Sequence, residues 1–195
     1  MQIVLIRHGE PDYTAVTQKG FIGHGRDLAH LTEDGKAQAE EAAKDPRLDG
    51  IELIVASPYT RALQTAAIIS RRRNIPIEIE LDLHEWLPDL TYTYPTDDLV
   101  VQAGQLMRGN KGICPTDSPI KFEELSAVFK RANACLQKYL GHKKIAVVCH
   151  AVVIRQFFFV KDIPFCGIFE IDFDEKFEWI GWQEHPWPPQ PKDRP

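Results

Sequence analysis

The chain has 195 residues, of which 44% are hydrophobic and 26% are charged, so it can build one sizeable core and is not a disordered chain. Its 23 lysines and arginines against 28 aspartates and glutamates give a net charge of −5, which argues against a general nucleic-acid-binding protein. If such an acidic chain handles an anion, its positive charge must be gathered locally.

The first half of the chain alternates apolar runs with helix-forming segments. In chain order we predict a strand over 2–7, a helix over 33–45, a strand over 51–56, a helix over 58–73 and a strand over 75–81. Continuous apolar runs such as QIVLIR and IELIVA are typical of parallel strands that are buried on both faces. Thr32 has N-cap chemistry, and Ser57 with Pro58 supplies a second cap and a first helical residue.

The second half begins with an irregular stretch and returns to regular elements. We predict a short helix near 97–107, an amphipathic helix over 122–139, a strand over 144–149, a helix over 151–159, a strand over 169–173 and a partner strand that ends near 182. Residues 88–119, rich in turn-forming side chains, are the predicted lid or specificity insertion. Five prolines make 185–195 an extended tail, so residues 1–184 are predicted to form a single domain.

Cysteine spacing and the N-terminal residues bear on the compartment. The four cysteines show no C-x-x-C pattern, which predicts free thiols rather than a disulfide framework or a zinc site. No signal peptide is evident at the N-terminus, and the most apolar long run, 145–160, is too short and too polar to span a bilayer. We therefore expect a cytoplasmic protein with no membrane partner.

Strands that alternate with helices predict an α/β fold, a three-layer α/β/α sandwich with a mainly parallel central sheet. Ligands bind such sheets beyond the carboxyl ends of the strands. Three predicted strands end near unusual polar residues: Arg7 and His8 after the first, Arg61 after the second, and His150 after a later one. Arginine presents forked donors that suit phosphate oxygens, and histidine near neutral pH can be an uncharged nucleophile. The pattern predicts a local anion pocket.

The motifs LIRHGE, LTEDGKAQAE, ASPYTRALQTA and VVCH occur in this order along the chain, and together they resemble the histidine phosphatase superfamily, in its phosphoglycerate-mutase-like branch. The resemblance covers nearly all of the chain up to the tail. It implies that His8 is the nucleophile, that Arg7 and Arg61 hold the phosphoryl oxygens and that His150 donates a further hydrogen bond. It also implies that Glu85 protonates the leaving oxygen and then activates water. Cationic side chains take the place of a metal, so we expect no metal and no cofactor.

Some positions fit the family pattern and others depart from it. Gly23 fits the glycine that the family places beside the phosphate, whereas Ala151 stands where a glycine usually follows the second histidine. Thr14 stands where many members carry an asparagine ligand of the phosphate, and its hydroxyl can donate one hydrogen bond. We expect these three residues at the phosphate or substrate site. His24 and Arg26 are candidates for reading the substrate, with a surface or loop position as the alternative for His24.

The proton donor has two competitors in the sequence. His84 and Asp89 lie close enough to Glu85 to replace it. The role requires a carboxyl group that is protonated near the working pH, and burial beside Trp86 and Leu87 would favour that state for Glu85.

The function we expect is a metal-independent phosphomonoesterase that acts on a small phosphorylated substrate through phospho-His8. One alternative is a relative with little catalytic activity that binds a phosphorylated ligand or protein. Another is a phosphotransferase of the phosphoglycerate mutase type. The longer mutase motif that follows the acid carboxylate is absent from LPDLTYTYPTDD, which favours a phosphatase. The sequence predicts no nucleic-acid partner and leaves the oligomeric state open.

Overall fold

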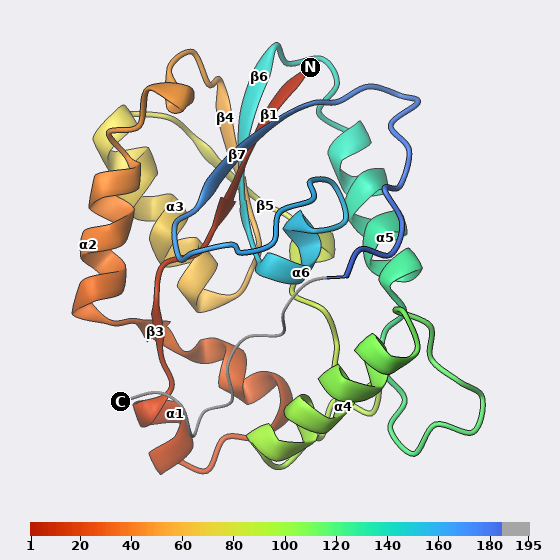
Figure 1. Ribbon diagram of the computed structural model, residues 1–195. Helices are drawn as coiled ribbons and strands as arrows, with labels where there is room; N and C mark the ends of the chain where they lie inside the picture. The colour runs from red at the N-terminus through yellow and green to blue at the C-terminus, as the bar shows by residue number, and fades with distance from the viewer. Residues whose placement is uncertain (185–195) are drawn as a thin grey trace.

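A five-stranded sheet forms the centre of the computed structural model, which describes residues 1–184; the predicted tail over 185–195 lies outside them (Figure 1). The strands are β1 (Gln2–Arg7), β4 (Leu53–Ala56), β5 (Ile77–Ile79), β6 (Lys144–Cys149) and β7 (Ile168–Asp172). They lie in the order β5-β4-β6-β1-β7. Neighbours among the first four strands pair in parallel, and β7 pairs antiparallel with β1.

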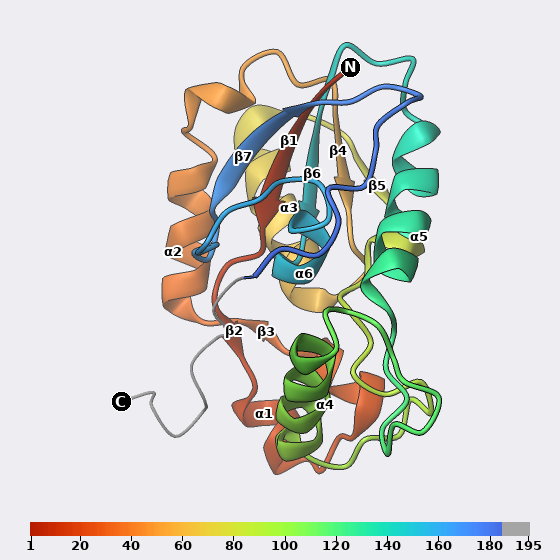
Figure 2. The same cartoon turned by 45° about the vertical axis from the view of Figure 1, so that its right-hand side comes forward.

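Helices cover both faces of this sheet. They are α2 (Glu33–Ala42) and α3 (Thr60–Arg73) on one face, and α5 (Leu125–Gln137) and α6 (Ala151–Ile154) on the other. Figure 2 shows the sheet between α2 and α5. Along β1, Ile3 and Leu5 belong to the core on the α5 side, whereas Val4 and Ile6 belong to the core on the α3 side. Because successive side chains of a strand point to opposite faces, one continuous apolar run supplies both cores. The predicted three-layer sandwich with a mainly parallel sheet is confirmed.

A further group of elements lies beyond the carboxyl ends of the parallel strands (Figure 1, Figure 2). It comprises α1 (Thr14–Gln18), a 3-10 helix (Gly23–Leu28), the strand pair β2 (Pro11–Asp12) and β3 (His30–Leu31), and α4 (Asp97–Gly109). The sequence predicted only α4. The other elements are too short for a periodic pattern to indicate them.

The predicted start of one helix is confirmed and that of another is wrong. Thr32 caps α2, since its Oγ1 accepts a hydrogen bond from the backbone N–H of Gly35 at 2.8 Å. By contrast, α3 begins at Thr60 rather than at Pro58. The Ser57 hydroxyl that was expected to cap it is paired with His150 Nε2 at 2.8 Å and also accepts the backbone N–H of Tyr59 at 3.3 Å, one residue before the helix begins. The hydroxyl therefore serves a local turn and a long-range contact rather than the first turn of α3.

The C-terminal third departs most from the prediction. α6 ends at Ile154 instead of continuing to residue 159, because the chain tightens into a turn where the Gln156 N–H donates to the Val153 carbonyl. The partner strand predicted to end near residue 182 is absent from the described residues. Phe177 and Trp179 pack against Phe129 instead, with ring centroids 6.5 Å and 6.2 Å away. Aromatic packing has replaced strand pairing there.

The cysteines and the membrane prediction can be compared directly with the structure. All four cysteines are free. Over residues 1–184, no helix combines the length and the apolar character that a membrane span requires.

Candidate active site

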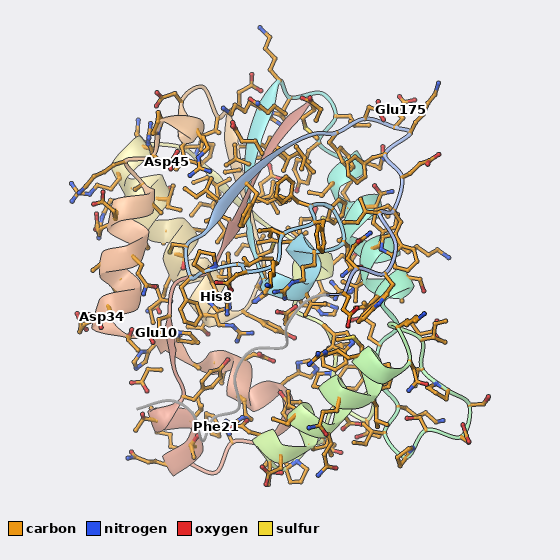
Figure 3. The ribbon with its side chains drawn as sticks, viewed as in Figure 1. His8, Glu10, Phe21, Asp34, Asp45 and Glu175 are labelled. Atoms are coloured by element: carbon orange, nitrogen blue, oxygen red, sulfur yellow. The ribbon has the colours of Figure 1, made fainter. Side chains whose placement is uncertain are left out.

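The residues that follow β1, β4 and β6 line a cavity of about 440 Å³. Arg7 and His8 come from the end of β1, Arg61 from the start of α3, and Ala151 from the start of α6. Glu85 reaches the same cavity from the segment that follows β5. Figure 3 shows His8 below the end of β1, at the end of the sheet that is directed toward α1 and α4. Five residues predicted at the site therefore line one cavity.

His8 is buried and uncharged. Its Nδ1 lies 2.7 Å from the Gly9 carbonyl oxygen, which can only accept, so Nδ1 carries the ring proton. The lone pair is then on Nε2, which accepts a hydrogen bond from Arg61 Nε at 3.2 Å. Burial, and next the positive charges of Arg61 and Arg7, hold the pKa of His8 well below its ordinary value of 6.5. The ring can therefore act as a nucleophile through Nε2.

Gly9 explains why the motif places glycine after this histidine. A side-chain Cβ on Gly9 would lie 2.5 Å from the carbonyl oxygen of Gly35, at the start of α2. The Gly9 N–H donates to Thr65 Oγ1 on α3 at 3.0 Å. Contacts with two helices thus fix the backbone that follows His8.

The two predicted phosphate-binding arginines are both held by other groups. Arg61 is 4% exposed, and its Nη1 donates to Asp27 Oδ1 at 3.0 Å. The Arg7 guanidinium lies 4.2 Å from the ring centre of Phe165 and donates from Nη1 to the Ile163 carbonyl. Burial lowers the pKa of Arg7 to about 10, which leaves it charged at neutral pH. The arginine charges are therefore fixed beside His8 before any ligand arrives.

His150 is fully buried and does not line the cavity, although its ring centroid lies 5.1 Å from that of His8. Its Nε2 is paired with Ser57 Oγ at 2.8 Å, while Nδ1 has no hydrogen-bond partner within residues 1–184. Burial, together with Arg61 and His8, lowers the pKa of His150 well below the ordinary value. The ring is thus neutral and carries one unsatisfied nitrogen.

Glu85 has the surroundings of a carboxyl group that holds a proton. Its Oε1 accepts from the Trp86 N–H at 2.8 Å and its Oε2 from the Val152 N–H at 3.5 Å. Burial raises the pKa of Glu85 above its ordinary value, although these hydrogen bonds and the nearby arginines oppose the shift. A raised pKa keeps more of the acid form near neutral pH.

The two competing donors are placed differently. His84 does not line the cavity, and its Nδ1 is bonded to the Glu85 carbonyl oxygen at 2.7 Å. Asp89 lines the cavity, but both of its carboxylate oxygens accept hydrogen bonds from Thr91, Oδ1 from the backbone N–H at 3.0 Å and Oδ2 from the hydroxyl. The surroundings favour Glu85 as the proton donor.

The remaining predicted residues divide into two groups. His24 and Arg26 line the cavity. Thr14 is exposed at the start of α1 and lies outside the cavity lining in the described chain; its neighbour Tyr13 lines the cavity instead. Gly23, also outside the lining, has a φ of 52°, and a Cβ there would lie 2.1 Å from the Tyr92 carbonyl oxygen. This glycine serves a close backbone approach to the segment before α4.

The lining residues that the sequence reasoning missed include Asp27, Tyr59, Arg155 and Phe165. Asp27 bridges two cavity residues, accepting from Arg61 through Oδ1 and pairing with His24 Nδ1 through Oδ2 at 3.1 Å. Only Arg155 had a usable signal, since it lies four residues after Ala151 on the same predicted helix face. Within residues 1–184, no group of three or more histidine, cysteine, aspartate or glutamate side chains is arranged to hold a metal ion.

Two curated relatives show sequence similarity to the chain. The 2,3-bisphosphoglycerate-dependent phosphoglycerate mutase of Thermoplasma acidophilum is 42% identical over 67 residues, which cover 34% of this chain and only 32% of the mutase. The probable phosphoglycerate mutase GpmB of Yersinia pestis is 26% identical over 151 residues, which cover 75% of this chain and 68% of that protein.

Two solved structures share the fold. A mycobacterial glucosyl-3-phosphoglycerate phosphatase has a TM-score of 0.68 at 19% identity and covers 95% of this chain and 98% of its own. The alpha-ribazole phosphatase of Shigella flexneri has a TM-score of 0.64 at 23% identity and covers 91% of this chain and 93% of its own. The family model described as the histidine phosphatase superfamily (branch 1) matches residues 3–162. The chain therefore belongs to the histidine phosphatase superfamily, as its motifs indicated.

Proposed function

We propose that this protein is a metal-independent phosphomonoesterase that hydrolyses a small phosphorylated substrate through a phosphohistidine on His8. One observation carries the proposal: a buried, neutral imidazole with its lone pair on Nε2 lies at a cavity that Arg7 and Arg61 also line. The cavity volume of about 440 Å³ is within the range of pockets that hold whole small molecules.

In the first half-reaction the substrate phosphoryl group is held by the guanidinium groups of Arg7 and Arg61. His8 Nε2 attacks phosphorus in line with the leaving oxygen, and the P–N bond forms as the P–O bond breaks. The Nδ1–H bond to the Gly9 carbonyl supports the positive charge that the imidazole ring gains. Glu85 gives its proton to the leaving oxygen, which departs as an alcohol.

In the second half-reaction Glu85 acts as a base. Its carboxylate removes a proton from a water molecule, and the water oxygen attacks phosphorus while the P–N bond breaks. Inorganic phosphate leaves, His8 returns to its neutral state and Glu85 regains its proton. The raised pKa of Glu85 supports both steps, because the group must hold and release a proton near the working pH.

His150 has the chemistry to assist from the side. If Nε2 accepts the Ser57 hydroxyl proton, a neutral ring carries its own proton on Nδ1, the nitrogen without a partner within residues 1–184. We propose that Nδ1 donates to a phosphoryl oxygen. Ala151 lines the cavity next to it and is assigned to the substrate side, with Arg26 and His24. Thr14 and Gly23 lie away from the cavity lining and are not assigned to it.

Turnover of p-nitrophenyl phosphate in the presence of a metal chelator tests the proposal, with His8→Ala as the comparison. We expect full wild-type activity in chelator and a loss of at least about a thousandfold in the variant, because the nucleophile is removed. A matched control is His30→Ala, which changes an exposed histidine outside the cavity lining. Wild-type turnover no faster than that of His8→Ala would contradict an enzyme and favour a protein that only binds phosphorylated ligands.

Mutase activity is the second candidate, because both curated relatives described above are named as phosphoglycerate mutases. Such an enzyme returns the phosphoryl group to another carbon of the substrate. Transfer between carbons of a phosphoglycerate, without net release of inorganic phosphate, would favour it. Net release of phosphate that depends on His8 would favour the phosphomonoesterase.

A further inference from the structure

Four arginines line the cavity within residues 1–184, and three of them are engaged by neighbouring groups. Arg7 donates to the Ile163 carbonyl. Arg26 donates to Asp97 Oδ2 at 2.6 Å, and Arg61 donates to Asp27 Oδ1 at 3.0 Å. The fourth, Arg155, makes no side-chain hydrogen bond or ion pair with the described part of the chain. Its role is unexplained by the reaction described above.

The start of α6 directs Arg155 to the cavity. The Arg155 N–H donates to the Ala151 carbonyl at 3.1 Å, and residues four apart on a helix share a face. Ala151 and Arg155 accordingly both line the cavity, next to the nucleophile and the acid. Arg155 Nε is buried and unpartnered. Burial lowers the pKa of this guanidinium, but arginine stays charged at any working pH.

The charges around Arg155 do not neutralise it. Glu85 and Asp162 attract it electrostatically, but neither forms an ion pair with it. Asp162 is exposed, so water screens its charge, and burial raises the pKa of Glu85, which favours the neutral form of that carboxyl group. A partly buried cation without a hydrogen-bond acceptor is unfavourable, and an anion that enters the cavity relieves this state.

We propose that Arg155 forms a subsite for a second anionic group of the substrate, a carboxylate or a second phosphate, separate from the phosphoryl group that Arg7 and Arg61 hold. The subsite deepens the proposed function and rests on it for the identity of the first site. A guanidinium binds either group through paired N–H donors, so the chemistry is shared. The cavity therefore favours phosphomonoesters that carry another negative charge.

Three compounds with the same three-carbon chain test the subsite: propyl phosphate, 3-(phosphonooxy)propanoate and propane-1,3-diyl bisphosphate. They differ only in the terminal methyl, carboxylate or phosphate group. Their dissociation constants are measured by calorimetry on His8→Ala protein, which does not consume them, and again after Arg155→Gln is added. The kcat/KM values of the wild type and of the Arg155→Gln variant are measured in parallel.

We expect at least one of the two compounds with a second anionic group to bind His8→Ala protein about tenfold more tightly than propyl phosphate does, because charge-assisted hydrogen bonds to Arg155 add to the affinity. The compound that gains identifies the second group as carboxylate or phosphate. Adding Arg155→Gln reduces the advantage to less than about twofold, and Arg155→Lys retains part of it. Wild-type kcat/KM values follow the same order. An advantage that is absent, or that survives Arg155→Gln, overturns the subsite.

A general charge effect and an indirect effect are separated by further readouts. Lys161→Gln removes a positive charge close to Arg155 in the sequence, from an exposed side chain outside the cavity lining. If that variant lowers the advantage as much as Arg155→Gln does, the subsite is wrong. Equal losses on all three compounds, with an altered pH profile, would assign Arg155 to positioning Glu85 instead. If the compounds bind in the expected order but no turnover depends on His8, the proposed phosphatase activity is refuted and the Arg155 subsite is retained.

Discussion

Burial moves the pKa values of His8 and Glu85 in opposite directions, and the two shifts together define a pH window for the reaction. The lowered pKa of His8 keeps the imidazole neutral well below pH 6.5, so the nucleophile is not lost at mildly acidic pH. The raised pKa of Glu85 keeps the carboxyl group protonated above its ordinary value of 4.5, until the pH rises past the shifted value. The proposed reaction therefore requires a pH above the pKa of His8 and below the pKa of Glu85.

We predict a bell-shaped dependence of kcat/KM on pH, with its maximum on the acidic side of neutrality. Glu85→Gln cannot donate a proton, so it removes the descending limb and lowers kcat by about 10²–10⁴-fold. Asp89→Asn is the matched control, since this carboxylate lines the same cavity but is held by Thr91. Activity that keeps rising into the alkaline range would rule out Glu85 as the acid.

Residue chemistry at the ends of strands could be predicted from the sequence, because parallel strands bring those ends to one edge whatever the details of the loops. Arg7, His8 and Arg61 meet at the cavity for this reason. Thr14 was expected at the phosphate or substrate site; the structure exposes its side chain and leaves it outside the cavity lining, so that role stays a prediction. Asp27 was missed because nothing local indicates that its carboxylate reaches Arg61, 34 residues away.

At the scale of elements, patterns long enough to show a period were predicted well and their ends were not. The continuous apolar run of β1 and the apolar spacing of α5 depend on local sequence, and both elements are present. The start of α3 depends on a tertiary partner, since the Ser57 hydroxyl that was expected to cap it also pairs with His150. Caps that a distant residue captures cannot be read from neighbouring residues.

One ion pair joins two of the elements beyond the strand ends. Arg26 of the 3-10 helix is almost fully buried and donates to Asp97 at the start of α4, within the predicted lid segment 88–119. The Gly23 N–H donates to the Tyr94 carbonyl at 2.9 Å and reinforces the connection. The position of α4 over the cavity therefore depends on a charge partner that Arg26 cannot easily replace.

We predict that Asp97→Ala lowers the free energy of unfolding by about 1–3 kcal/mol, because it leaves a buried guanidinium short of an acceptor. It should also raise KM more than it lowers kcat, since Val100 and Val101 of α4 line the cavity. Urea denaturation and steady-state kinetics measure the two effects. Asp98→Ala, in the same first turn but without this partner, serves as the control. Equal effects of the two substitutions would show that the ion pair does not position α4.

For the molecule as a whole, the net charge of −5 and the cationic cavity are compatible because the arginines are concentrated at one edge of the sheet. Two of them are balanced by Asp27 and Asp97, so the acidic total partly reflects the groups that hold the site in place. The same burial that fixes these charges also excludes protons from His8 and His150. Folding stability is thereby linked to pH.

Below about pH 6.5 the unfolded chain takes up protons on His8 and His150, whereas the folded chain excludes them. The free energy of unfolding therefore decreases as the pH is lowered, by up to about 1.4 kcal/mol per pH unit for each histidine. Glu85 acts in the opposite direction, because its raised pKa lets the folded chain bind a proton at a higher pH than the unfolded chain does. This effect offsets at most the contribution of one of the two histidines. We predict that the urea concentration at the midpoint of unfolding decreases clearly when the pH is lowered from 7.5 to 5.5. The His8→Asn/His150→Asn variant should lose less than the wild type, while His30→Asn, on the exposed surface, should lose as much. Equal losses in the double variant and the wild type would mean that the two buried rings do not control acid stability.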